Sequence, residues 1–349
     1  MNPFLEVISD ASFIKAMFSS LFFILLAFLL VRFHLVPLKT KEVLNELVMK
    51  LFLPALAFTA FFSDFNQEQF FSSIGVFLLT IFFYLLLFLL SFLCFLHYKK
   101  EKAKIYSIFS TLGQLTFFSI PLLKSIYSES VSAILIPASL MTIAFRLFLY
   151  LYSYIVLSGE KLSRENIWPF TKKILFNPII VMMFLGMILF LIQNVTFQVD
   201  IEGISYGFLR IDKTAPFLYE PLKLLSDFST PACMMLVGAT LASVDIKNSI
   251  KKLSIWFISL FRSILSPLLV LAICLLIHKT GFFSFDEYTL SCLVIGFGAP
   301  MSAVIDAYAS HFHKEEDVAS GVCFLSTVFS FVSIPLCFTL IKLSLNVLW

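Results

Sequence analysis

Apolar residues run along this chain in long stretches that short polar breaks separate. Stretches such as 19–31 and 76–96 consist almost entirely of Phe, Leu, Ile and similar residues. As helices that rise ~1.5 Å per residue, stretches of this kind can cross a ~30 Å hydrocarbon layer. Grouping them between the breaks predicts ten transmembrane helices, at residues 13–33, 43–62, 69–96, 104–127, 131–157, 172–193, 221–243, 250–277, 287–310 and 317–344.

The polar breaks alternate in charge along the chain. One set is rich in basic residues, namely Arg32, Lys39, Lys41, Lys99, Lys100, Lys102, Lys104, Lys161, Arg164, Lys172, Lys173, Lys247, Lys251, Lys252 and Lys314. The other set holds few Lys and Arg and includes Asp64, Glu68, Glu129, the 194–220 connection, Asp286 and Glu287. By the positive-inside rule the first set is cytoplasmic, so both termini are expected outside a cell membrane. Ten helices also require the two termini to share a side.

The composition supports a multi-pass membrane protein and excludes several other classes. Of the 349 residues 60% are hydrophobic and 13% are charged, and the mean hydropathy is +0.96. The net charge of +3 and the scattered basic residues do not indicate nucleic-acid binding. The six cysteines lie in apolar segments without the spacing of a metal site. The sequence therefore predicts neither a metal nor another cofactor.

Two prolines interrupt predicted helices at corresponding places, Pro121 in the fourth and Pro300 in the ninth. A proline inside an apolar helix removes a backbone donor and clashes with the preceding turn. Hydrocarbon cannot satisfy the polar groups that this defect leaves, so such breaks line polar sites in transporters.

Further landmarks repeat in the same order in both halves of the chain. Pro54 pairs with Pro231 and His97 pairs with His278, each at an offset of roughly 180 positions, like Pro121 and Pro300. Halves of five helices each must be inverted relative to one another in the membrane. We therefore expect inverted repeats at 1–157 and 172–349, joined by a cytoplasmic linker at 158–171.

The connection between the sixth and seventh helices alternates apolar and polar residues. Val195, Phe197, Val199 and Ile201 are each separated by a polar residue. This period of two predicts a small extracellular hairpin.

The order and spacing of several short motifs resemble the auxin efflux carrier family. The matching segments cover most of the chain and are Leu53-Pro54-Ala55-Leu56-Ala57-Phe58, Asn177-Pro178-Ile179-Ile180 with Gly186, residues 231–242, Ala299-Pro300, Tyr308-Ala309, residues 317–320 and Ser326-Thr327. The resemblance implies a ten-helix fold related to bile-acid and sodium–proton transporters, with broken helices four and nine crossing at their centres. It also implies a scaffold of helices one, two, six and seven, often forming a homodimer, against which the other six move. The chain departs from the family in having Gln114 and Ser119 where Asn and Gly are usual.

The substrate site is expected where the two broken helices meet. A half-helix that begins at proline leaves free N–H groups, here at residues 122–124 and 301–303, and such helix ends attract anions. The predicted site residues are Gln114, Thr116, Ser119, Pro121, Gly298, Pro300 and Ser302. Alternatively, the Ser and Thr hydroxyls only satisfy carbonyl groups around a kink.

Three charged residues fall within predicted helices near this site. Asp306 lies six residues after Pro300, roughly 9 Å along a helix, and is the candidate for proton coupling. Equally, Asp306 could form a static ion pair with Arg146 or Arg262, or either arginine could bind a substrate carboxylate.

The sequence as a whole predicts a secondary transporter of small organic anions that works by alternating access with an elevator-like motion. Coupling to protons or to sodium ions is left open. The alternatives are a cation–proton antiporter on a related fold and a membrane receptor that binds a ligand without transporting it.

Overall fold

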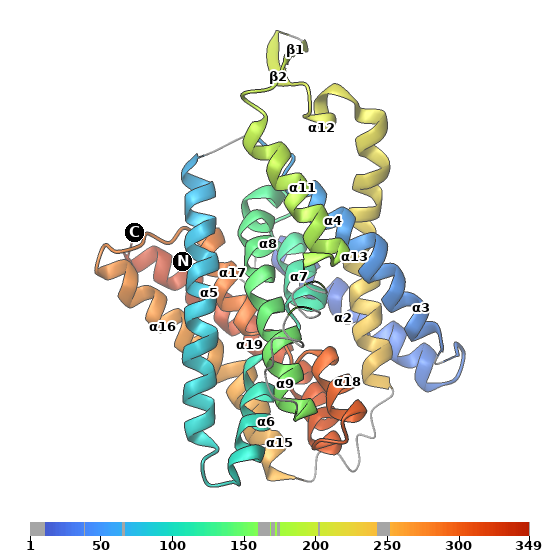
Figure 1. The fold of residues 1–349 in the computed structure, drawn as a ribbon, viewed down its shortest axis with the longest axis vertical. Coiled ribbons are helices and arrows are strands. Elements are labelled where there is room, and N and C mark those ends of the chain that lie inside the picture. The colour runs from blue at the N-terminus through green and yellow to red at the C-terminus, as the bar shows by residue number, and fades with distance from the viewer. Residues whose placement is uncertain are drawn as a thin grey trace.

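The protein is built almost entirely of helices (Figure 1). The computed structural model describes residues 11–37, 39–64, 67–159, 168, 172, 175–201, 203–242 and 252–348. Its elements are α2 (Ala11–Arg32), α3 (Lys39–Leu47), η1 (Val48–Phe52), α4 (Leu53–Thr59), α5 (Gln67–Cys94), α6 (Lys100–Thr111), η2 (Leu115–Ser119), α7 (Ile120–Ile126), α8 (Val131–Leu147), η3 (Phe148–Tyr152), α9 (Ser153–Ser158), α11 (Pro178–Ile192), β1 (Gln198–Ile201), β2 (Ile204–Gly207), α12 (Ile211–Thr214), α13 (Pro216–Ala242), α15 (Leu253–Leu260), η4 (Phe261–Leu265), α16 (Ser266–Lys279), α17 (Glu287–Phe297), α18 (Ala303–His311) and α19 (Glu316–Leu348).

Every apolar stretch of the sequence forms a helix or a run of helices in the described residues. Five of these helices are long and apolar enough to cross a membrane, at Ala11–Arg32, Phe70–Cys94, Pro216–Ala242, Leu253–Lys279 and Glu316–Leu345. Shorter apolar helices include Leu115–Ile126 and Glu287–Phe297. The expectation of an all-helical membrane protein is confirmed at this level. Most of the linker predicted at 158–171 lies outside the described residues.

Wide π-helical turns, labelled η, precede prolines in three places. The turns η1, η2 and η4 end two residues before Pro54, Pro121 and Pro267, respectively. Proline has no N–H group, and its ring would clash with the carbonyl of an α-helical turn. A π-helical turn changes the hydrogen-bond register just before the proline, so the helix continues through it. Pro121 therefore does not interrupt its helix, contrary to the sequence prediction.

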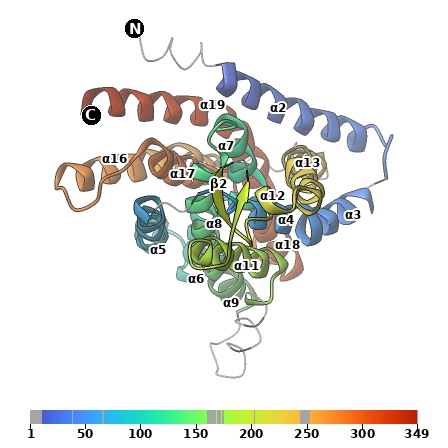
Figure 2. The ribbon, with the colours of Figure 1, turned by 90° about the horizontal axis from the view of Figure 1, so that it is seen from above.

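The helices pack as two groups around a central core. In one group α2 packs on α13, and α4 packs on both α11 and α13. Two glycines allow these contacts, since a Cβ at Gly238 would lie 2.1 Å from the Ile24 carbonyl oxygen and one at Gly186 would lie 2.8 Å from that of Phe58. In the other group α5 packs on α6 and α8, and α19 packs on α15, α17 and α18. Viewed from above, α7, α8 and α17 lie in the middle, with α5 and α16 on one side and α3 and α13 on the other (Figure 2).

The predicted hairpin is present as the antiparallel pair β1 and β2, at the end of the molecule away from α6 and α15 (Figure 1). Next to it, the buried side chain of Arg210 bonds to Asp212 at 2.8 Å, to Asp64 at 2.7 Å and to Gln193 at 3.1 Å. Burial opposes the charge of Arg210, but the bonds to Asp212 and Asp64 outweigh that effect and raise its pKa above the usual value. Arg210 thus ties the hairpin region to α11 and to the turn after α4.

Candidate functional site

Two helices of the molecule are interrupted, and their interruptions pair with each other. The first interruption is at residues 112–114, between α6 and η2, and the second is at 298–302, between α17 and α18. Gly113 and Met301 form an antiparallel bridge there. The backbone N–H of Gln114 donates to the Pro300 carbonyl at 2.6 Å, and that of Ser302 donates to the Leu112 carbonyl at 3.2 Å. Backbone groups that the interruptions release therefore satisfy one another across the two halves of the chain.

The backbone donors predicted at residues 122–124 are not free, because the interruption lies before η2 and not at Pro121. In the second helix the N–H of Met301 donates to Ser326 Oγ at 3.0 Å, and that of Ser302 is used in the bridge. Ser302 caps α18, where its Oγ accepts from Val304 N at 3.4 Å. The N–H groups of residues 122–124, Met301 and Ser302 are therefore not free to bind an anion in this structure, contrary to the prediction.

Four of the predicted residues line one small cavity. Gln114, Thr116, Arg146 and Ser302 contribute to its wall, together with Met49, Phe117, Phe145, Leu149 and Val304. The cavity volume is about 20 Å³, which is room for about one water molecule. Arg146 is 2% exposed and brings a buried positive charge to this wall. We call this space the polar cavity.

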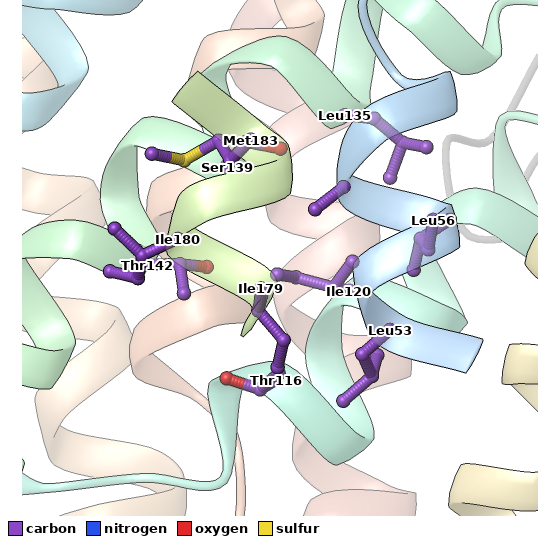
Figure 3. Close-up of a pocket in the computed structure, with 11 residues that line it drawn as sticks. Leu53, Leu56, Thr116, Ile120, Leu135, Ser139, Thr142, Ile179, Ile180 and Met183 are labelled. Carbon is purple, nitrogen blue, oxygen red and sulfur yellow. The ribbon is translucent and has the colours of Figure 1, made fainter. Parts of the chain in front are cut away.

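A second cavity of about 20 Å³ lies between the two groups of helices (Figure 3). The apolar side chains of α4 and α11, such as Leu53, Leu56 and Ile180, face Ile120 and Leu135 across it. Its polar wall residues are Thr116, Ser139 and Thr142. We call it the apolar cavity.

Thr116 lines both cavities. It is 5% exposed, and its hydroxyl has no hydrogen-bond partner among the described residues. By contrast, the Thr142 hydroxyl donates to the Ala138 carbonyl at 2.9 Å. A buried hydroxyl without a partner costs ~1–3 kcal/mol, so Thr116 is a group that a bound ligand could satisfy.

The remaining predicted residues, Ser119, Pro121, Gly298 and Pro300, do not belong to the walls of these two cavities. The Ser119 hydroxyl donates to the Ile295 carbonyl at 3.0 Å, and the Gly298 carbonyl accepts from Ser330 at 3.2 Å. Ser119 therefore satisfies a carbonyl of α17, as the alternative for hydroxyls near a kink predicts. Pro121 is buried inside α7.

Asp306 and the two arginines do not form one cluster in the described part of the chain. The Asp306 carboxylate accepts a hydrogen bond from Ser320 at 2.8 Å. Arg262 is completely buried, and its Nε and Nη1 donate to the carbonyls of Ala299 at 2.8 Å and Thr111 at 2.5 Å. The ion pair considered for Asp306 with Arg262 is therefore not formed in this structure.

Ion pairs also join the ends of the two interrupted helices. Lys102 pairs with Glu315 at 2.9 Å and Lys314 pairs with Glu101 at 2.7 Å, which ties the start of α6 to the turn between α18 and α19. The interrupted helices are thus held together both at their interruptions and at one end.

Some residues of the site were missed in the sequence. Thr142 lies one helical turn before Arg146, so their shared helix face was a usable signal. Ser139 lies on the same face, two turns before Arg146, whereas Met49 carries no such signal because only the packing of separate helices brings it to the polar cavity.

A family model described as membrane transport protein, the family of the auxin efflux carriers, matches residues 12–338. The chain belongs to the auxin efflux carrier family. This family is one of membrane transporters and not of enzymes, so the chain is a membrane-embedded transport protein. A comparison with curated proteins finds no match.

Proposed function

We propose that this member of the auxin efflux carrier family is a secondary transporter of small organic anions, carboxylates among them. The observation that carries the proposal is the polar cavity, where the buried Arg146 shares a wall with Gln114, Thr116 and Ser302. An arginine can bind a carboxylate through two parallel hydrogen bonds, and uncharged amide and hydroxyl groups can complete its coordination. The adjoining apolar cavity offers space for the hydrocarbon part of the same molecule.

The transport cycle requires a larger site than the described conformation contains. Each cavity has room for about one water molecule, so a carboxylate enters only when the helix groups move apart. The apolar cavity lies between α4 and α11 on one side and η2, α7 and α8 on the other. In our proposal α2, α4, α11 and α13 are the scaffold, and the remaining helices carry the site past it in an elevator-like movement.

This mechanism uses the inverted repeats inferred from the sequence. The interruptions at 112–114 and 298–302 would be the crossing centres of helices four and nine, one from each of the repeats 1–157 and 172–349. Their mutual backbone pairing supports this assignment. The proposal also includes a homodimer that forms through the scaffold helices. Both termini of the chain are proposed to lie outside the cytoplasm.

Binding is tested by thermal-shift measurements on the purified protein with acetate, pyruvate, malate, citrate and benzoate. The carboxylate that binds best is then titrated against Arg146→Gln. Loss of a buried charged partner costs about 2 kcal/mol or more, so the Kd should rise at least ~30-fold. Arg32→Gln, the same change of charge at the exposed end of α2, is the control and should leave the Kd unchanged. Equal affinity of Arg146→Gln and the wild type would refute this site.

Proton coupling through Asp306 is tested separately, in proteoliposomes with an imposed pH gradient. Asp306 is half-buried and hydrogen-bonded to Ser320, and a carboxyl at membrane depth is an expected proton carrier. Asp306→Asn should abolish the stimulation of uptake by the gradient but keep substrate binding. Unchanged stimulation would exclude the coupling role. Sodium-driven pH change without any organic substrate would favour the cation–proton antiporter instead.

A further inference from the structure

Backbone carbonyls at the two interruptions bond to one arginine, Arg262. The last carbonyls of a helix have no partner within that helix. Here α6 ends at Thr111, whereas α17 ends at Phe297 with Gly298 as its C-cap, so Ala299 is the first residue of the linker beyond that helix. The Thr111 carbonyl accepts from Arg262 Nη1 at 2.5 Å and the Ala299 carbonyl accepts from Arg262 Nε at 2.8 Å. One side chain thus satisfies the carbonyl of the last residue of α6 and a carbonyl of the linker between α17 and α18.

Arg262 is fixed through two of its nitrogens, whereas the third, Nη2, is buried without a hydrogen-bond partner among the described residues. It lies in η4 and is completely buried. Its third guanidinium nitrogen, Nη2, occupies the space next to Gly113, where a Cβ would come within 1.7 Å of it. Any side chain at Gly113 would therefore displace the guanidinium. Glycine at this position is required by the arginine and not by an unusual backbone conformation.

The charge of Arg262 faces backbone carbonyls at the two interruptions. None of the ion pairs formed by the described residues involves Arg262. The carboxyl end of a helix carries a partial negative charge of roughly half an elementary charge. The guanidinium bonds to the last residue of α6 and to Ala299, two residues after the end of α17, so the partial negative charges of these carbonyls offset part of its positive charge. Without Arg262, these two carbonyls would lose a partner in the linkers that lead to the polar cavity.

We infer that Arg262 is a positioning residue for the anion site of this carrier. Gln114 and Ser302, which line the polar cavity, follow Thr111 and Ala299 by only three residues each. By holding the two carbonyls, Arg262 fixes the linkers that carry both cavity residues, and its charge cancels the negative potential that would repel an anion. In this arrangement Arg146 contacts the substrate, whereas Arg262 acts through its hydrogen bonds to the backbone carbonyls of Thr111 and Ala299. This inference rests on the proposed anion transport.

The experiment compares Arg262→Gln, Arg262→Lys and Gly113→Ala in proteoliposomes. It uses the radiolabelled carboxylate from the panel of acetate, pyruvate, malate, citrate and benzoate that binds the wild type best. Arg262→Gln should raise the KM for uptake about tenfold and change the maximal rate per folded protein less than twofold. Arg262→Lys keeps the charge but offers one nitrogen, so it should restore part of the affinity. A loss of structure alone would lower the amount of active protein and leave the KM unchanged.

Gly113→Ala keeps every polar group of the site and only displaces the guanidinium. It should raise the KM as Arg262→Gln does. In a double-mutant cycle, Gly113→Ala should have much less effect in the Arg262→Gln background, because the shorter side chain leaves room for the methyl group. An unchanged KM in both single variants, or fully additive effects in the double variant, would overturn the role of Arg262. Absence of saturable uptake by the wild type would instead refute the proposed function.

Discussion

Replacement of Thr116 by valine tests whether its hydroxyl lowers the stability of the ligand-free protein and strengthens substrate binding. Thr116 lies on the walls of both cavities, is 5% exposed, and has a hydroxyl without a partner among the described residues. Burial of such a hydroxyl costs ~1–3 kcal/mol. Valine has nearly the same shape without the hydroxyl, so Thr116→Val should stabilise the ligand-free protein by about 1 kcal/mol.

Thr142→Val is the matched control because its hydroxyl does have a partner. Thr142 lines the apolar cavity, but its Oγ1 donates to the Ala138 carbonyl at 2.9 Å. The same substitution there removes a satisfied hydrogen bond and should destabilise the protein by about 1 kcal/mol. The two valine variants should therefore shift the apparent Tm in opposite directions, by roughly 2 °C each for a protein of this size.

The assay measures unfolding in detergent for both variants and then the affinity of Thr116→Val for the best carboxylate of the panel. A hydrogen bond to a charged ligand contributes ~1.5–3 kcal/mol, so the Kd should rise roughly 10- to 100-fold. The variant is thus expected to be more stable and to bind more weakly. A lower Tm for Thr116→Val, or an unchanged Kd, would refute the conclusion that this hydroxyl has no partner in the free protein and bonds to the ligand.

Two further contacts outside the cavities give predictions of their own. Lys124 of α7 bonds to the Ser226 carbonyl and to Asp227 of α13, both at 2.9 Å, and so joins the proposed moving and scaffold groups. Because these bonds must break in each transport cycle, Lys124→Gln should raise the maximal uptake rate by about threefold or more. A slower maximal rate would contradict the assignment of the two groups. Arg210→Met should lower the stability by about 3 kcal/mol, measured as a loss of several degrees in Tm, because it leaves the buried Asp212 without its partner. Asp64→Asn, at the 90% exposed end of the same network, should lower the stability by less than about 1 kcal/mol. Equal losses of stability in the two variants would show that burial does not decide how much an ion pair contributes to stability.

Local features of the sequence were enough to find the helices and the hairpin. Apolar stretches of membrane length appear as helices because every backbone group must be satisfied within its own segment in hydrocarbon. The alternation around Val199 produces a hairpin because successive side chains of a strand point to opposite faces. Both signals depend only on neighbouring residues.

The position of the first interruption was not predictable in the same way. Pro121 indicated a break at that residue, but η2 accommodates the proline and the break lies at 112–114. There the Leu112 carbonyl and the Gln114 N–H find partners in residues 300–302 of the other half. A helix is interrupted where another segment supplies the missing hydrogen bonds, and that segment is known only from the fold.

The sequence by itself determined the apolar helical segments, the hairpin and the membrane transport family, and it singled out Gln114, Thr116, Arg146 and Ser302 by their types and spacing. Tertiary structure decided which polar groups meet. It brought Arg146 to the cavity wall, bonded Arg262 to the Thr111 carbonyl and bonded the Ser119 hydroxyl to a carbonyl of α17. The physical reason is that hydrophobic patterning acts along the chain, whereas the partner of a buried polar group is set by the packing of helices that lie far apart in sequence.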